Sequence, residues 1–409
     1  MTLPTASAAQ HRDSRPDPPA DPARALARAR DLAPRFAARA GHHDASGSFP
    51  ADDFADLRAH GLLGLLAPAR LGGCGATFAD YAAVATELGA GAGATALIFN
   101  MHASVTGALA HTPDDLVRQL GAPDSFFAAR DRVLARAAEG ALYAVAMSER
   151  GAGSRLSQIT TAYHRTGSGY RVTGAKTFVS GAGHADAYLV AARDAGSDEP
   201  RISYFLVPAG EGVRVEHTWD SLGMRATGSH DLHLDAEVGP DALLGGLEGL
   251  AVLLAQVMPQ WLVASYSAVY VGVARAALQE AVSHLRDRGL HTLPAVRARV
   301  GRADAAVAAA GLVVAEAARR VTEQPGTPET NRWVWRAKLT AGDTAAEVAS
   351  SVLEAAGASA TRRGHPLERL YRDARCGALQ PATSDVCADW LGTAALQDDP
   401  DRDAQVPRW

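Results

Sequence analysis

The sequence predicts an α+β protein with three consecutive parts: a helical N-terminal domain, a middle antiparallel β domain and a C-terminal four-helix bundle. Two observations predict it. Apolar residues recur at helical spacing before about residue 140 and after about residue 245, whereas short runs rich in β-branched and aromatic residues lie between. Gly, Ser and Asp interrupt those middle runs, as turns do between antiparallel strands. The order along the chain is α, then β, then α.

The N-terminal helical domain is expected over residues 24–140. "PARALARARDLAPRFAARA" and "SFPADDFADLRAHGLLGL" are amphipathic, and "GATALIFNMHASVTGALAH" is apolar nearly all round, which predicts a buried helix. Residues 1–23 contain Pro, Ala and charge but no apolar run. This composition predicts a disordered lead-in, with no signal peptide or membrane anchor.

The middle domain is expected over residues 141–245. "TGSGYRV" predicts a β-hairpin with its turn at Gly167–Gly169. A strand ending at Met147 runs into a loop, Ser148–Ser154, that contains two glycines and two serines. Small hydroxyls and exposed backbone N–H groups in such a loop suit the polar edge of a flat ligand. From these residues alone, an ordinary hairpin loop is the simpler interpretation.

The C-terminal bundle is expected over residues 246–396, followed by a frayed tail, 397–409. Thr327 and Pro328 suit the cap and first position of a helix. Long helices with short links predict antiparallel packing. The expected helices are Leu247–Arg288, His291–Glu323, Thr327–Ala356, Leu367–Arg375 and Pro381–Leu396.

Composition argues against several classes of function. The 409-residue chain has a formal net charge of −5 with both signs interspersed, whereas nucleic-acid binding usually needs a concentrated basic face. Cys74, Cys376 and Cys387 show no metal-ligand spacing, so we expect reduced thiols and no metal. The apolar runs are interrupted or too short for a confident membrane span. We therefore expect a cytoplasmic protein without a nucleic-acid or membrane partner.

Five motifs, in order between about residues 25 and 395, resemble those of the acyl-CoA dehydrogenase family. They are "SERGAGSR", "YRVTGAKTFVSGAGHADAYLV", "SLGMRATGSHDLHLDAEVGPDALLGG", "VGVARAALQEAVSHLRDR" and "EAAGASATRRGHPLERLYRDAR". The resemblance implies that family's fold and bound FAD. It also implies a homodimer or homotetramer, because the family shares its FAD diphosphate site between subunits.

The resemblance assigns cofactor contacts to single residues. In the family, the position of Phe178 covers one flavin face and that of Ser180 donates near flavin N5. Arg288 matches an arginine that reaches the diphosphate from the neighbouring subunit, although "RGLHT" departs from the family's Arg-x-x-Phe-Gly. Glu354 stands where a glutamine often sits. The full expected set is Met147, Ser148, Gly153, Ser154, Phe178, Ser180, Arg288, Glu354, Gly357 and Thr383.

The family's catalytic base is missing. Its glutamate, which takes the substrate's α-proton, occupies one of two places that here hold Pro381 and Leu262. No Asp or Glu occurs between residues 259 and 277. The catalytic residue therefore stays unassigned, with His102, Gln380 and Asp385 as weak candidates.

Each weak candidate has a simpler interpretation. Asp385 lies just beyond Thr383, where a helix-starting aspartate is expected. His102 lies close to a functional histidine in a monooxygenase branch of the family, but a buried histidine bonded to a backbone carbonyl is simpler. Gln380 falls near a second histidine of that branch and cannot exchange protons.

Three functions remain open from the sequence. The leading hypothesis is an FAD-dependent oxidoreductase acting on CH–CH donors, which moves hydride from an acyl-CoA or acyl-carrier-protein thioester to flavin N5, in specialised metabolism. Its electrons would leave to a flavoprotein or to O2. The alternative is a monooxygenase of the same fold that uses reduced flavin and O2. The third is an inactive flavin-binding relative.

Overall fold

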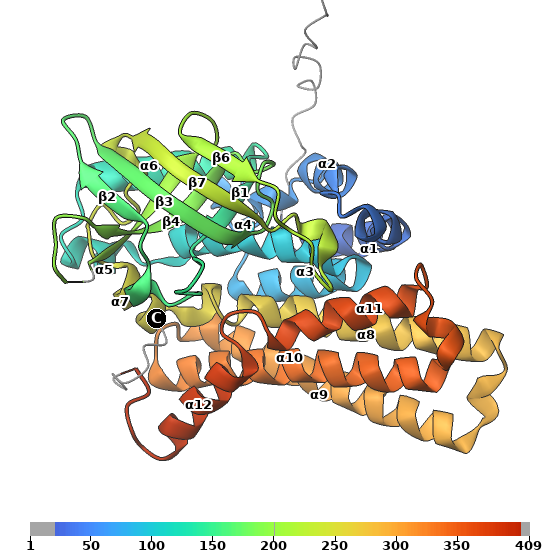
Figure 1. Ribbon diagram of the computed structural model, residues 1–409. Helices are drawn as coiled ribbons and strands as arrows, with labels where there is room; N and C mark the ends of the chain where they lie inside the picture. The colour runs from blue at the N-terminus through green and yellow to red at the C-terminus, as the bar shows by residue number, and fades with distance from the viewer. Residues whose placement is uncertain (1–20, 200, 402–409) are drawn as a thin grey trace, which may run out of the picture.

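The computed structural model describes residues 21–199 and 201–401, and its first part is helical as predicted (Figure 1). Asp21 caps the first helix by accepting a hydrogen bond from Arg24 N, so Pro22 and Ala23 are helical rather than part of the lead-in. Residues 1–20 of the predicted lead-in lie outside the described residues. The helices are α1 (Pro22–Ser46), α2 (Ala51–Ala59), α3 (Phe78–Gly91), α4 (Gly93–His111), α5 (Asp114–Gln119) and α6 (Asp124–Ala138).

The middle part forms one seven-stranded sheet, in the order β1-β4-β2-β3-β7-β6 with β5 paired to β4. The predicted hairpin is confirmed, because β2 and β3 pair antiparallel with Arg165 opposite Tyr170. The wholly antiparallel expectation is wrong for two pairs, β1–β4 and β2–β4, which are parallel. Turn signals identify strands but do not fix which strands become neighbours. The strands are β1 (Tyr143–Ala146), β2 (Ala162–Arg165), β3 (Tyr170–Val179), β4 (Ala187–Asp194), β5 (Ile202–Pro208), β6 (Val213–Glu216) and β7 (His230–Val238).

The C-terminal part is a bundle whose three longest helices lie side by side (Figure 1). The single helix expected over Leu247–Arg288 is two helices, because Pro259 interrupts it and starts a short 3-10 turn. Thr327 caps the third long helix through a hydrogen bond from Thr330 N, as predicted. The helices are α7 (Ala251–Val257), α8 (Ser265–Asp287), α9 (Pro294–Glu323), α10 (Pro328–Ala356), α11 (Pro366–Arg375) and α12 (Ser384–Ala395).

Helix α4 is the centre of the molecule. It lies between the sheet and the bundle and packs against both β1 and α8 (Figure 1). Its predicted burial is confirmed, since almost every residue from Gly93 to Leu109 is buried. The segment Pro259–Asp287 is apolar and long enough to cross a membrane by composition, but 78% of its most apolar window is buried inside the protein. Both helices therefore belong to the core.

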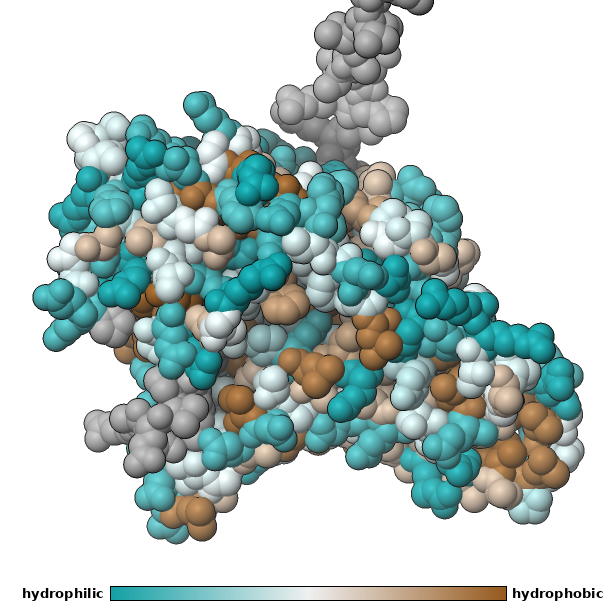
Figure 2. Space-filling view, in the orientation of Figure 1, coloured by the Kyte–Doolittle hydropathy of each residue, from teal (hydrophilic) through white to brown (hydrophobic). Residues whose placement is uncertain are grey.

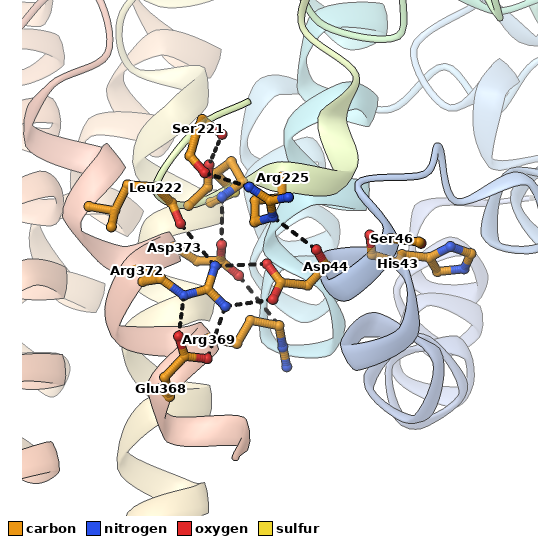
Figure 3. Close-up of polar contacts among 12 residues, drawn as sticks. His43, Asp44, Ser46, Ser221, Leu222, Arg225, Glu368, Arg369, Arg372 and Asp373 are labelled. Atoms are coloured by element: carbon orange, nitrogen blue, oxygen red, sulfur yellow. Dashed lines mark hydrogen bonds and ion pairs between the residues drawn. The ribbon is translucent and has the colours of Figure 1, made fainter. Parts of the chain in front are cut away.

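An ion-pair network joins the three parts (Figure 3). Arg372 on α11 contacts Asp44 on α1, with Nη2 2.5 Å from Oδ2, and donates to the Leu222 carbonyl in the β part at 2.9 Å. The neighbouring Asp373 accepts a hydrogen bond from Met224 N at 2.6 Å. Because α11 leads directly into residues 376–381, this network fixes that turn relative to the sheet.

Candidate functional site

The loop after β1 is folded around its own buried carboxylate. Glu149 turns inward, where its Oε1 accepts hydrogen bonds from Lys176 Nζ at 2.8 Å and from Thr161 N at 3.0 Å. Its Oε2 accepts one from Thr160 N at 2.7 Å. Burial alone raises the pKa of Glu149, but the Lys176 ammonium and the Thr160 hydrogen bonds outweigh it and lower the pKa to about 2. The loop therefore has a rigid internal anchor.

That anchor places the loop beside the end of β3. The Ser148 carbonyl accepts a hydrogen bond from Thr177 N at 2.9 Å, and the Met147 carbonyl accepts one from Lys176 Nζ at 3.2 Å. Within the described part of the chain, the half-buried hydroxyls of Ser148 and Ser154 have no hydrogen-bond partner. Both are free to contact a ligand.

Phe178 extends from an irregularity in β3 with an unusual backbone. Its φ is 58°, in the left-handed region, and its side chain is 62% exposed. The ring meets Trp219 edge to face at a centroid distance of 6.0 Å. A left-handed non-glycine residue costs roughly 1–2 kcal/mol, and solvent exposure of a large ring adds nothing to folding. The arrangement suits a wall for a flat aromatic ligand.

Ser180, two residues further on, belongs to a chain of buried hydroxyls. Its Oγ lies 2.9 Å from Ser229 Oγ, which lies 2.7 Å from Thr227 Oγ1. Thr227 Oγ1 lies 2.8 Å from the Met224 carbonyl oxygen, which can only accept. Phe178 and Ser180 therefore lie at the C-terminal end of β3, to which the hydrogen bond from Thr177 N to the Ser148 carbonyl joins the loop.

The residues expected to contact the FAD diphosphate lie away from this loop, at one end of the helical bundle. Arg288 is exposed at the end of α8, and Glu354 and Gly357 stand at the end of α10, beside the same end of the bundle (Figure 1). Glu354 pairs with Arg299 Nη1 at 2.6 Å. Within one chain the structure does not bring these residues to the Ser148–Ser154 loop. Thr383 caps α12.

The turn between α11 and α12 carries no proton acceptor of the family's kind. Pro381 and Leu262 are both half-buried, and Asp385 is exposed in the first turn of α12. The buried Lys338 donates to the Gly377 and Gln380 carbonyls at 2.9 and 3.1 Å, and burial lowers its pKa to about 8. These hydrogen bonds from Lys338 on α10 therefore hold the turn between α11 and α12 in place.

His102 and Gln380 differ in whether they have a side-chain atom free to bond a ligand. His102 is 1% exposed, with Nε2 2.7 Å from the Leu63 carbonyl and Nδ1 accepting from Tyr143 N at 3.1 Å. Both ring nitrogens are engaged, and burial lowers its pKa to about 4. Gln380 instead has a buried Oε1 without a donor among the described residues. A buried acceptor without a donor in the protein can accept a hydrogen bond from a bound ligand.

Several contributing residues carried no sequence signal. Trp219 follows β6 in a segment without periodicity, and Thr227 and Ser229 lie in a turn far from Ser180 in sequence. Lys338 sits on an ordinary amphipathic helix. Among the described residues no cluster of three His, Cys, Asp or Glu side chains could hold a metal ion. The hydroxyls of Ser148 and Ser154 and the exposed ring of Phe178 fit a flavin ring.

A separate groove of about 680 Å³ lies between α1, α8 and α11, beside the network of Figure 3. Four arginines and three carboxylates line it, and none of the expected flavin residues does. Figure 2 shows several apolar side chains along the band where the β part meets the C-terminal helices, and others at the far end of the bundle. Exposed apolar side chains from those segments include Phe178, Leu222 and Leu379.

Comparison with known proteins identifies the three parts. Models of the N-terminal, middle and C-terminal domains of acyl-CoA dehydrogenase match residues 22–119, 144–236 and 264–384. An L-evernosamine nitrososynthase from Micromonospora sp. is 32% identical over 90% of this chain and 89% of its own. A putative acyl-CoA dehydrogenase from Bacillus subtilis is 29% identical over 90% and 95%. The crystal structure of FMN-bound TdsC from Paenibacillus sp. A11-2 has a TM-score of 0.80 at 28% identity, covering 91% of this chain and 97% of that one.

Proposed function

Because this chain belongs to the acyl-CoA dehydrogenase family, a group of flavoproteins, we propose that it departs from the parent reaction and is a flavin-dependent monooxygenase. It would take up externally reduced flavin and use O2. Reduced flavin supplies the electrons that activate oxygen. One observation carries the proposal: neither position that holds the family's base carries a carboxylate, and Asp385 is exposed in the first turn of α12.

The absent carboxylate matters because an α-proton of a thioester is weakly acidic. Its removal needs a base within hydrogen-bond reach, and Leu262, Pro381 and the enclosed, neutral His102 cannot supply one. Oxygen transfer to an electron-rich atom needs no such base. The monooxygenase named in a TdsC structure and the nitrososynthases among the relatives agree with this choice.

We place the substrate beside the start of α8, where the half-buried residues are uncharged. On the stretch from Trp261 to Ala274, every residue is buried except Leu262 and Tyr266, which stand one helical turn apart and are half-buried. Tyr266 packs against one core cluster and Leu262 against another, and Val145 on β1 packs against both. This face, formed by Val145, Leu262 and Tyr266, suits a neutral, largely apolar substrate.

Tyr266 is the one polar group on that face. Among the residues that the structure describes, its hydroxyl has one hydrogen-bond partner, Met101 Sδ at 3.7 Å, which is a weak acceptor. Burial raises its pKa, so the phenol stays protonated and acts as a hydrogen-bond donor rather than a base. We propose that the Tyr266 hydroxyl orients the substrate by donating a hydrogen bond to it.

FMN suits the chain better than FAD. A diphosphate beside Glu354 would face a carboxylate where the family often has a neutral amide, and Arg299 neutralises it only in part at an exposed position. FMN has no such diphosphate. The FMN in the TdsC crystal structure is consistent with this preference.

The deciding experiment supplies the protein with FMN, an NADH-driven flavin reductase and ¹⁸O2. The panel contains sulfur and nitrogen heteroaromatics and amino sugars, with catalase present to remove released hydrogen peroxide. We expect ¹⁸O in a product that forms only when the protein is added. In parallel, acyl-CoA thioesters should fail to bleach the flavin-loaded protein without oxygen. Anaerobic bleaching by a thioester would refute the proposal.

A further inference from the structure

His230, a half-buried histidine at the start of β7, has its neutral tautomer fixed by a backbone contact. Its Nδ1 lies 3.1 Å from the backbone nitrogen of Trp219, and a backbone N–H can only donate. Nδ1 must therefore present its lone pair, and neutral His230 carries its proton on Nε2. That proton is donated to Nδ1 of His217, 3.2 Å away.

The same contact joins His230 to the exposed aromatic pair of the candidate site. The indole of Trp219 meets the ring of Phe178 edge to face, with centroids 6.0 Å apart and an interplanar angle of 90°. Among the described residues, His230 Nδ1 is the one acceptor for the backbone N–H of Trp219. The indole N–H donates separately to the Met224 carbonyl at 3.2 Å. His230 thus holds the backbone of Trp219, and Met224 holds its ring.

Protonation of His230 is incompatible with this contact. The imidazolium carries a proton on both nitrogens, so its Nδ1–H would face the Trp219 N–H, and two donors would stand 3.1 Å apart. A half-turn of the ring brings a C–H group to the same place, which supplies no acceptor either. His217 differs, because it is exposed and can turn away when protonated without moving Trp219. The protonation state of His230 therefore decides whether the Trp219 backbone is held.

The surroundings of His230 favour its neutral form. Burial lowers the pKa of His230 below its ordinary value of 6.5, and His217 and His184 lower it further, whereas Asp231 raises it. Asp231 is itself paired with Arg150 Nη2 at 2.7 Å, which weakens its attraction for a second cation. The charged and titratable groups on the segments around His230 are Glu216 on β6, His217, the exposed pair of Asp220 and Arg225, Asp231 and His233 on β7, His184 in the turn after β3, and Arg150 in the loop after β1.

We propose that His230 is a positioning residue that holds Trp219 against Phe178 while it is neutral and releases it when protonated. After release, the bond to the Met224 carbonyl alone holds the indole, so the aromatic pair loosens. A flat aromatic ligand that packs on the pair then binds less tightly in acid. This binding step rests on the proposed flavin site, whereas the hold of His230 on Trp219 does not.

Fluorine NMR of the protein labelled with 5-fluorotryptophan tests the hold on Trp219 without any ligand. The signal lost in Trp219→Phe assigns its resonance. We expect this resonance to shift in the native protein as pH falls, with a midpoint below 6.5. His230→Asn replaces Nδ1 by an amide oxygen that accepts from Trp219 N but does not titrate, so the shift should disappear. His217→Asn is the matched control and should keep the shift.

A second measurement on the native protein needs no variant of His230 to fold. In ¹⁵N-histidine spectra, His230 Nδ1 should have the chemical shift of an unprotonated nitrogen at neutral pH and should titrate together with the Trp219 resonance. A protonated Nδ1 at neutral pH would overturn the inference. So would a Trp219 resonance that does not move with pH, or that moves equally in His230→Asn.

Lumiflavin, an isoalloxazine without a phosphate group, tests the consequence for binding, because its own charge is constant over this range of pH. Loss of one positioning hydrogen bond predicts about fivefold weaker binding by the native protein in acid, and no change for His230→Asn. If the Trp219 resonance shifts and lumiflavin affinity does not, the binding step is wrong. If lumiflavin binds at no pH, the proposed flavin site fails, and the NMR results still decide what His230 does.

Discussion

Lys176 Nζ lies 2.8 Å from Glu149 Oε1, and both side chains are almost completely enclosed. The pair joins β3 to the loop that follows β1, so it supports the candidate flavin site without facing it. Partners of this kind are costly to separate, because the remaining charge stays buried alone.

Glu149→Gln should therefore lower the free energy of unfolding at pH 7 by about 3–5 kcal/mol. Folding lowers the pKa of Glu149 from its ordinary value near 4.5 to about 2, so its stabilisation is present above pH 4.5 and lost as pH falls through 2. The difference between native and variant proteins, measured by urea unfolding, should shrink across that window. Glu329→Gln, in an exposed ion pair with Arg336 on α10, is the control and should change little. A pH-independent difference would contradict the assignment.

Phe178 should show a conflict between stability and binding. At φ 58°, glycine is free of the strain that any other residue carries, so Phe178→Gly should be about 1 kcal/mol more stable than Phe178→Ala. Both variants remove the ring beside Trp219, so both should lose flavin affinity to a similar extent. Thermal unfolding and flavin titration measure the two effects. If Phe178→Ala were the more stable variant, the strain assignment would be wrong.

His102 should act on stability and not on turnover. Burial lowers its pKa from 6.5 to about 4, so the unfolded chain takes up a proton between these values while the native state does not. The free energy of unfolding should therefore fall by about 3 kcal/mol as pH drops from 6.5 to 4. His102→Gln should remove this dependence, and exposed His42→Gln should not. If the His102→Gln protein folded and bound flavin but lost turnover, His102 would have a role in catalysis.

Glu354 should bias the choice between FMN and FAD. Glu354→Gln removes the carboxylate expected beside the diphosphate, so affinity for FAD should rise several-fold while affinity for FMN stays the same. Glu347→Gln, on the same helix two turns earlier, is the control. Fluorescence titration with both cofactors gives the ratio. A rise for both flavins, or for neither, would remove Glu354 from the diphosphate site.

Tyr266 should donate a hydrogen bond to the substrate. Quinoline and naphthalene share a shape, but only quinoline has an acceptor, so the native protein should bind quinoline roughly fivefold tighter. Tyr266→Phe should abolish the difference. Tyr270→Phe, one turn along α8, removes a fully buried hydroxyl that has no partner among the described residues, and it should retain the difference. Equal binding of both probes by the native protein would exclude this role.

The sequence by itself determined the order of parts and most elements. The burial of α4, the cap at Thr327 and the β2–β3 hairpin follow from periodicity and turn chemistry, which are local properties. The family motifs also indicated the absence of a base at Leu262 and Pro381, because a missing side chain is visible in the sequence.

Only the tertiary structure decided what the remaining polar groups can do. Both ring nitrogens of His102 contact the backbone, at Leu63 and Tyr143, and no spacing in the sequence encodes these contacts. The parallel pairing of β1 with β4 and the contact between the Ser180 and Ser229 hydroxyls likewise depend on partners distant in the chain. Hydrogen-bond direction and proton affinity are set by what surrounds a group in space, and packing brings together residues whose separation in sequence carries no record of it.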